Sequence, residues 1–228
     1  APLFGLTATL AVYVLAQALS VRSGHAPWAN PVMVSVAILA SVMLATGTAY
    51  PTYFAGAQFI HFLLGPAVVA LGWPLWQRRA ALRSRWGRLV LASLAGGSAA
   101  AASAVGLGWA LGLPADVLMS LAPKSVTAPV AMGIAAQVGG VPALAAVFAA
   151  LTGMVGALSA RWLFGLMRLP TDAQGMALRG FALGTASHGI GAAHALQVHA
   201  EAGAYAGLAL GLQVVLAAVL MPLVFRLL

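Results

Sequence analysis

The sequence predicts an all-helical polytopic membrane protein with about seven or eight apolar segments, arranged in two structural repeats that contain broken or re-entrant helices. Of the 228 residues, 62% are hydrophobic and only 6% are charged, whereas a soluble domain carries about 25% charged residues. So few charges cannot cover a water-facing surface, and most side chains at the surface must therefore face lipid. The absence of cysteine excludes disulfides and cysteine-based metal or redox sites.

Apolar segments follow one another along the chain, and each approaches the length of about 20 residues that a helix needs to cross a bilayer. They cover residues 3–20, 31–49, 58–76, 88–112, 118–138, 141–160, 180–199 and 203–226. Turn residues or charges separate them. The first segment lacks a preceding basic region, so no cleavable signal peptide is expected.

Most of the positive charge lies in two loops between these segments. Eleven Lys and Arg residues outnumber the three acids Asp116, Asp172 and Glu201, which gives a formal net charge of +8. The densest basic runs fall at 78–88 and 161–179. This pattern is typical of loops that orient a membrane protein, so we expect both on the cytoplasmic side and expect no nucleic-acid partner.

Placing both loops on one side requires that one segment between them does not cross. Segment 118–138 is the candidate, because Pro123 and Pro129 interrupt a helical ladder. Lys124 would also be costly at the centre of a bilayer. We therefore expect this segment to be broken or re-entrant and to lie against protein or a water-filled cavity.

The chain also suggests an internal repeat within a single transmembrane domain, 1–228. Repeat 1 would cover about 3–112 and repeat 2 about 118–226, in inverted orientation. Asn30 and Pro31 precede one apolar run as Val141 and Pro142 precede another, and the stretch around Gly65 and Pro66 resembles 181–186. Frequent Gly, Ala and Leu could also produce such matches by chance. Many transporters combine repeats of this kind with a substrate site at broken helices.

The first candidate site is the stretch around Lys124, the only charged residue between Asp116 and Arg161. Ser125 and Thr127 add hydroxyl groups, and the flanking prolines free backbone groups. A cation, hydroxyls and half-helix N-termini together favour binding of an anion. The alternative is a lysine that extends to the membrane interface.

The second candidate site is a glycine-rich interruption of segment 180–199. Its polar side chains are Thr185, Ser187 and His188, and its glycines include Gly189 and Gly191. Glycines allow a helix to unwind, and His188 can exchange a proton near neutral pH. The alternative is a helix-packing stretch with a buried, hydrogen-bonded histidine.

Other titratable residues carry weaker signals. Glu201 could pair with Lys124 or take up a coupling proton, or it could be a loop residue among lipid headgroups. His188, His194 and His199 do not share one helical face, so neither a metal site nor another cofactor is expected. No nucleophile, base and acid stand together, so an enzyme is not expected either.

Several of these motifs resemble the LrgB/CidB family over essentially the whole chain. The most specific are Pro-Lys-Ser at 123–125 and Ser-His-Gly at 187–189. The similar stretches are residues 30–31, 62–67, 121–132, 139–142, 183–191 and 201–204. One departure is His194, where family members often carry Arg. The second positive charge that the family pattern provides is therefore weaker in this chain.

The resemblance implies a multi-pass protein of the bacterial inner membrane and two possible functions. The first is a transporter of small monocarboxylates such as glycolate, glycerate or pyruvate. His188 and Glu201 are the candidates for coupling this transport to a proton. The alternative is a holin/antiholin-like regulator of murein hydrolase export and cell lysis. The resemblance also implies a small LrgA/CidA-like membrane partner. A homodimer or higher oligomer is expected from the small-residue spacing of Gly108 and Gly112 and of Gly207 and Gly211, which could equally pack the two repeats together.

Overall fold

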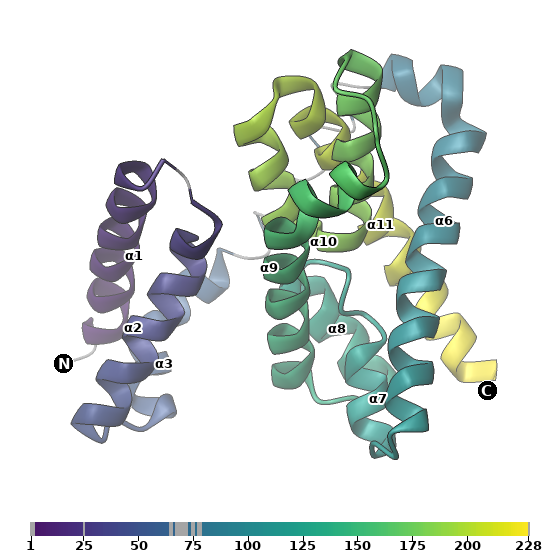
Figure 1. Cartoon of the computed structure of the whole chain (residues 1–228). Coiled ribbons are helices and arrows are strands. Elements are labelled where there is room, and N and C mark those ends of the chain that lie inside the picture. Colours follow the sequence, from purple (N-terminus) through teal and green to yellow (C-terminus); the bar gives the residue numbers. More distant parts are fainter. Residues whose placement is uncertain are drawn as a thin grey trace. The chain divides into compact units, whose positions relative to one another are not determined.

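The computed structural model describes residues 3–24, 26–63, 66, 73, 76 and 79–227, and every regular element among them is helical. The chain divides into two compact units, Ala1–Ala67 and Val68–Leu228 (Figure 1), called here the N-terminal and the C-terminal unit. The all-helical fold predicted from composition is confirmed. The two repeats and the single domain stay predictions.

The described residues of the N-terminal unit form three helices and one helical turn. Its elements are α1 (Phe4–Arg22), a 3-10 turn (Pro27–Ala29), α2 (Pro31–Thr46) and α3 (Tyr50–Phe62). Asn30 caps α2 by accepting hydrogen bonds from the amides of Val32 and Met33 at 3.0 and 3.3 Å, and Pro31 begins the helix, where its missing N–H costs nothing. Helix α1 packs on both α2 and α3.

Six helices of the C-terminal unit lie among the described residues. They are α6 (Arg79–Ala110), α7 (Ala115–Leu121), α8 (Ala128–Val138), α9 (Pro142–Leu166), α10 (Ala173–Val198) and α11 (Ala200–Leu227). Small residues dominate the contacts between them. Ala131, Ala135, Ala145 and Ala149 form one buried cluster, for example. Helices meet closely through such residues when lipid, rather than water, surrounds them.

Helices α7 and α8 form a hairpin that returns to the end of the unit from which it starts. Leu118 and Leu121 of α7 lie beside Gly108, near the end of α6. A methyl group at Gly140, just after α8, would lie 2.9 Å from the amide nitrogen of Ser120. The Ser120 hydroxyl also accepts a hydrogen bond from the Val141 amide at 2.7 Å. The prediction that segment 118–138 is broken or re-entrant is therefore confirmed.

Helix α10 folds back on itself in the same way. Ser187 (φ −125°, ψ 15°) and His188 (φ 40°, ψ −135°) leave the helical conformation. A methyl group at Gly191 would lie 2.8 Å from the carbonyl oxygen of Leu183, eight positions earlier, which a straight helix would not allow. Each half is shorter than the about 20 residues that a crossing needs. Segment 180–199 is thus a second re-entrant hairpin.

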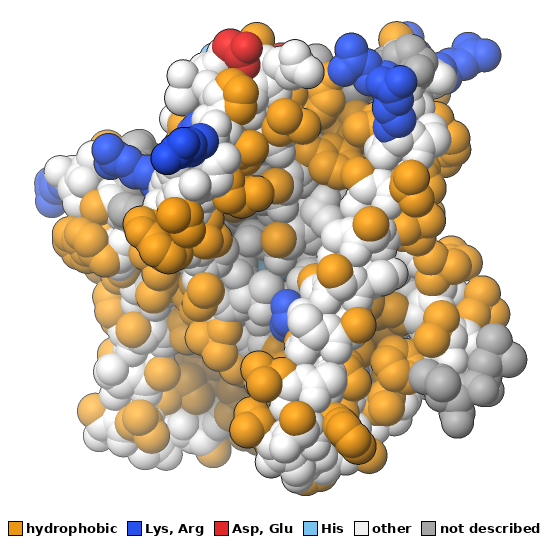
Figure 2. Space-filling view, turned by 45° about the vertical axis from the view of Figure 1, so that its right-hand side comes forward, with side chains coloured by type: hydrophobic (Ala, Val, Ile, Leu, Met, Phe, Trp, Pro, Cys, Tyr) orange, Lys and Arg blue, Asp and Glu red, His pale blue; other side chains and the backbone are white. Residues whose placement is uncertain are grey.

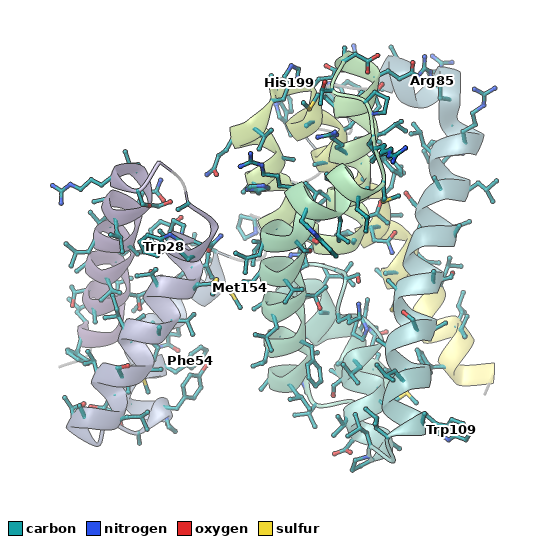
Figure 3. The ribbon with its side chains drawn as sticks, in the orientation of Figure 1. Trp28, Phe54, Arg85, Trp109, Met154 and His199 are labelled. Atoms are coloured by element: carbon teal, nitrogen blue, oxygen red, sulfur yellow. The ribbon has the colours of Figure 1, made fainter. Side chains whose placement is uncertain are left out.

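The two hairpins enter the unit from opposite ends. The base of the α7–α8 hairpin lies at the start of α9, where Ser120 binds Val141. The base of the α10 hairpin lies between the end of α9 and the start of α11, where Leu196 packs on Gly203. Figure 3 shows Arg85 and His199 near one end of the C-terminal unit and Trp109 near the other. Both hairpin tips therefore point toward the middle of α9.

Within the described ranges, four helices are long and apolar enough to cross a membrane. They are Phe4–Arg22, Arg85–Ala110, Pro142–Leu166 and Ala200–Phe225. Large apolar side chains such as Leu44, Trp109 and Leu166 are exposed on the helices. Blue basic side chains gather at one end of the C-terminal unit, beside long stretches of orange apolar ones (Figure 2). The chain is thus a multi-pass membrane protein.

The two basic loops lie at the same end of the C-terminal unit. The start of α6, which carries Arg79 and Arg85, and the end of α9, which carries Arg161, both lie opposite the α7–α8 base (Figure 1). This arrangement agrees with the predicted placement of both loops on one side. Most of segment 58–76 lies outside the described residues.

Candidate functional site

The tips of the two hairpins meet in a cavity of ≈ 380 Å³. Its lining comes from four elements: α6, the break between α7 and α8, the middle of α9, and the tip of α10. The lining residues are Ala100, Lys124, Ser125, Leu151, Thr152, Val155, Gly156, Ala186 and Ser187. The cavity therefore lies at mid-depth of the helices α6 and α9 that are long enough to span a membrane. We call it the tip cavity.

The first wall of the tip cavity is the non-helical stretch 122–127. Pro123 is buried there and cannot donate a backbone hydrogen bond. Lys124, half-buried, places its ammonium nitrogen 3.4 Å from the Ser125 hydroxyl. Among the described residues no acidic side chain forms an ion pair with Lys124. The tip cavity thus holds a positive charge that the neighbouring protein does not neutralise.

The second wall is the tip of the α10 hairpin. Ser187 is buried and lines the tip cavity. Among the residues that the structure describes, its hydroxyl forms no hydrogen bond. A methyl group at Gly156 would overlap this hydroxyl, so the glycine is what makes room for it. Ser187 is therefore available to donate a hydrogen bond to a bound solute.

His188 is buried but does not line the tip cavity. Its Nε2 lies 2.7 Å from the carbonyl oxygen of Ala149 in α9. Because a carbonyl can only accept, Nε2 carries the proton and donates. The imidazole therefore holds the hairpin tip against α9, which corresponds to the buried, hydrogen-bonded histidine considered as the alternative from the sequence.

The remaining polar candidates lie outside the cavity lining. The hydroxyls of Thr127 and Thr185 are buried and have no hydrogen-bond partner in the described chain. Thr127 precedes α8, and Thr185 packs its methyl group toward Gly96 of α6. Gly189 follows the break, with open space where a side chain would begin, whereas Gly191 packs against Ser187. The structure thus brings together Lys124, Ser125 and Ser187, three of the six polar side chains predicted to meet.

Glu201 lies in the first turn of α11, where its amide donates to Nδ1 of His199 at 3.1 Å. This turn belongs to the base of the α10 hairpin, whereas Lys124 lies at the tip of the other hairpin. His194 is half-buried in the second half of α10. Within the described residues no three His or acidic side chains are grouped to hold a metal ion.

The predicted helix-breaking residues take different places. Pro123 lies inside the break, whereas Pro129 occupies the first turn of α8, where a helix tolerates proline. Asn30 and Pro31 start α2 in the N-terminal unit. Gly65 lies outside the described residues. Pro66 is helical, but the residues on either side of it are not described.

The sequence reasoning missed the contribution of α9. Segment 141–160 reads as an ordinary crossing, yet Thr152 and Gly156 line the tip cavity. The available signal was a hydroxyl residue followed by glycines at 153 and 156 within an otherwise apolar run. Such small residues are typical of close helix contacts in membranes.

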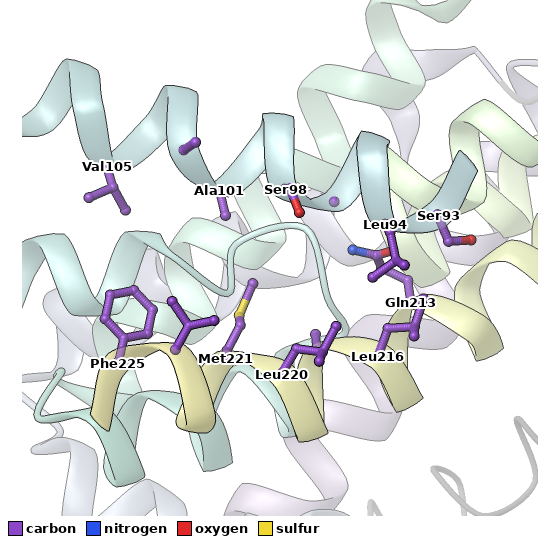
Figure 4. A pocket seen from close by; sticks show the side chains of 14 residues that line it. Ser93, Leu94, Ser98, Ala101, Val105, Gln213, Leu216, Leu220, Met221 and Phe225 are labelled. Atoms are coloured by element: carbon purple, nitrogen blue, oxygen red, sulfur yellow. The ribbon is translucent and has the colours of Figure 1, made fainter. Parts of the chain in front are cut away.

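A second cavity of ≈ 350 Å³ lies between α6 and α11. Figure 4 shows Val105, Leu220 and Phe225 along it, with Ser93 and Gln213 toward one end. The Ser93 hydroxyl oxygen and the Gln213 side-chain oxygen are themselves buried and without partners among the described residues. This cavity is almost entirely apolar.

These features define a multi-pass helical membrane protein in which two re-entrant hairpins enclose a cationic cavity. The model of the LrgB-like family matches residues 9–227. The chain therefore belongs to the LrgB-like family, as the motifs around Lys124 and Ser187 predict.

Relatives from several bacteria support this assignment. The uncharacterized protein YxaC of Bacillus subtilis (strain 168) is 31% identical over 198 residues, which are 87% of this chain and 84% of that protein. An uncharacterized protein of Haemophilus influenzae is 30% identical over 200 residues, 87% of this chain and 84% of that protein. The holin-like protein CidB of Staphylococcus aureus (strain Mu50 / ATCC 700699) is 28% identical over 220 residues, 96% of this chain and 93% of that protein. No solved structure matches the chain.

Proposed function

We propose that this chain carries small organic monoanions across the membrane, with glycolate, glycerate or pyruvate as the substrate class. The observation that supports this proposal most is the shared cavity of Lys124 and Ser187, at the tips of two hairpins that enter from opposite ends. A carboxylate would pair with the ammonium of Lys124. The hydroxyl or keto oxygen of the solute would bond Ser187 or Thr152.

The charge of the tip cavity favours a single carboxylate. One lysine without an acidic partner balances one negative charge, and a second carboxylate would remain unpaired at high cost in a low-dielectric site. The cavity volume of ≈ 380 Å³ is ample for a solute of three carbons. Broken helices at the centre of a membrane are also typical of transporter substrate sites.

A second candidate function is holin-like control of cell-wall hydrolases and lysis. The comparisons favour this candidate over the first, because relatives from Staphylococcus aureus and Staphylococcus epidermidis are named holin-like protein CidB. The names of the relatives do not mention a carboxylate. A pore of this kind needs apolar helices that associate, whereas a charged, mid-depth cavity has no evident use in it.

Uptake into liposomes distinguishes the two candidates. We expect protein-containing liposomes to take up labelled glycolate or pyruvate with saturation, and expect Lys124→Ala to abolish this uptake. A holin-like pore would instead release an entrapped neutral dye, without saturation and irrespective of Lys124. Uptake equal to that of protein-free liposomes, together with dye release, would reject the carrier in favour of the holin-like function.

The same proposal includes the surroundings of the protein. We place it in the bacterial inner membrane with both basic loops toward the cytoplasm, as a homodimer or higher oligomer, and without catalytic activity of its own. A small LrgA/CidA-like membrane protein is the proposed partner. Cross-linking in native membranes, followed by mass determination, tests both the oligomer and this partner.

A further inference from the structure

The tip of the α10 hairpin has a backbone conformation that requires support. His188 has φ 40° and ψ −135°, a backbone conformation that residues other than glycine rarely adopt. A strained residue of this kind persists only where the surrounding structure holds it. Two contacts that hold this residue come from one stretch of α9, at Ala149 and Gly153.

The first support is the hydrogen bond from His188 Nε2 to the Ala149 carbonyl at 2.7 Å. In a helix this carbonyl already accepts a bond from the amide four residues later, at Gly153, but a carbonyl oxygen has two lone pairs. The imidazole uses the second one. His188 is 4% exposed, so water cannot readily replace this bond.

The second support is the shape of α9. A methyl group at Gly153 would lie 2.9 Å from the imidazole Nε2 and Cε1, and one at Gly156 would overlap the Ser187 hydroxyl. The two glycines therefore form a shallow seat for both residues of the break. The same turn of α9 carries Thr152, which faces the tip cavity together with Gly156.

We infer that His188 is a positioning residue that fixes the Ser187 hydroxyl in the tip cavity. It does so by packing, together with Ser187, on Gly153 and Gly156 of α9. His188 itself does not touch the solute. Thr152 adds a hydroxyl from the seat, so that α9 sets the spacing between two donors that face the solute. This inference rests on the proposed carrier function for the identity of the solute, but the seat can be tested without it.

A cysteine reporter tests the seat directly, because the chain has no cysteine of its own. Ala186, exposed and lining the tip cavity, is replaced by cysteine. The rate of its reaction with a charged, membrane-impermeant thiol reagent is measured in liposomes. The reporter is then combined with Gly156→Ala, Gly153→Ala, His188→Ala or His188→Gln. The matched control is Gly165→Ala, on the same helix, where a methyl group meets nothing within 4 Å.

We expect His188→Ala to change the labelling rate by about tenfold, the factor that corresponds to one lost buried hydrogen bond. Gly156→Ala should also change the rate, because its methyl group would displace the Ser187 hydroxyl. Gly153→Ala should have a smaller effect, and it keeps the test informative if Gly156→Ala does not accumulate. His188→Gln retains an N–H donor and should recover part of the rate. Equal labelling rates in all variants and in the Gly165→Ala control would overturn the inference.

The solute separates this inference from the carrier proposal. Glycolate should slow labelling of the reporter, and His188→Ala should raise the glycolate concentration needed for half protection, and the KM of uptake, more than it lowers the maximal rate. If glycolate never protects the reporter while the seat variants still change its labelling, the seat stands and the carrier function fails. If glycolate protects equally in His188→Ala and in the unsubstituted reporter, the positioning role fails.

Discussion

The two re-entrant hairpins of the C-terminal unit reach the same cavity by different means. The α7–α8 hairpin is interrupted by six residues, 122–127, which include Pro123 and present Lys124. The α10 hairpin is interrupted at Ser187 and His188 only, and its tip is held by a side-chain hydrogen bond to α9. The first break is thus longer and charged, and the second is shorter and is held by a hydrogen bond to α9.

This difference suggests separate roles: the first hairpin supplies the charge of Lys124, and the second fixes the position of the Ser187 hydroxyl. A lysine with several rotatable bonds can reach an anion over a range of backbone positions. A hydroxyl bond has a short reach and depends on direction, so Ser187 needs a backbone that is held in place. If the two hairpins divide the work in this way, variants in the first should affect affinity for any anion. Variants in the second should affect the discrimination between solutes.

The largest expected effect is the loss of glycolate affinity when the charge of Lys124 is removed. Lys124→Met removes the cation and preserves most of the apolar stem, so glycolate affinity should fall by at least about tenfold, since hydrogen bonds to charged groups contribute about 1.5–3 kcal/mol. Stabilisation of the purified protein against heating by glycolate measures this affinity. Arg161→Met, at the end of α9, serves as the control for net charge. Equal stabilisation of Lys124→Met and the unsubstituted protein would remove the lysine from the site.

The second prediction concerns the packing of the α10 hairpin. A methyl group at Gly184 would overlap the Ala206 carbonyl oxygen of α11. We expect Gly184→Ala to lower the free energy of unfolding by about 1–3 kcal/mol, as overpacking does. Gly189→Ala, which meets nothing within 4 Å, is the matched control and should be milder. Thermal unfolding in detergent, followed by circular dichroism, compares the two variants.

A smaller effect is expected at the base of the α7–α8 hairpin. The Ser120 hydroxyl donates to the Asp116 carbonyl at 2.6 Å and accepts from the Val141 amide at 2.7 Å. Ser120→Ala should cost about 1–2 kcal/mol, because it removes both bonds. Ser159→Ala, which loses a single bond to the Val155 carbonyl, is the comparison. Identical melting temperatures for the two variants would show that this base does not hold the hairpin.

The smallest effect is expected at the base of the α10 hairpin. Asp172 caps α10 by accepting from the Gly175 amide at 2.7 Å, at an exposed position. Asp172→Ala should therefore cost only about 0.5–1 kcal/mol. Asp172→Asn keeps the acceptor and should recover most of this loss in the same melting experiment. A loss larger than that of Gly184→Ala would reverse the order proposed for this hairpin.

The positions of both breaks were predictable, because the causes are local. Pro123 lacks an amide hydrogen, and the glycines at 184, 189 and 191 weaken the helix around them. The roles of the neighbouring polar residues were not predictable in the same way. Thr127, Thr185 and His188 are as polar as Ser125 and Ser187, and no local pattern distinguishes those that line the cavity.

Composition, hydropathy and motifs by themselves determined that this is a helical membrane protein of the LrgB-like family with interrupted helices. These properties depend on the chain's preference for lipid and on backbone chemistry at single residues. Only the tertiary structure decided that the two interruptions are hairpins whose tips meet, that His188 turns to Ala149, and that Thr152 and Gly156 of α9 complete the cavity. Those contacts join residues distant in sequence, and packing between helices, rather than local propensity, selects them.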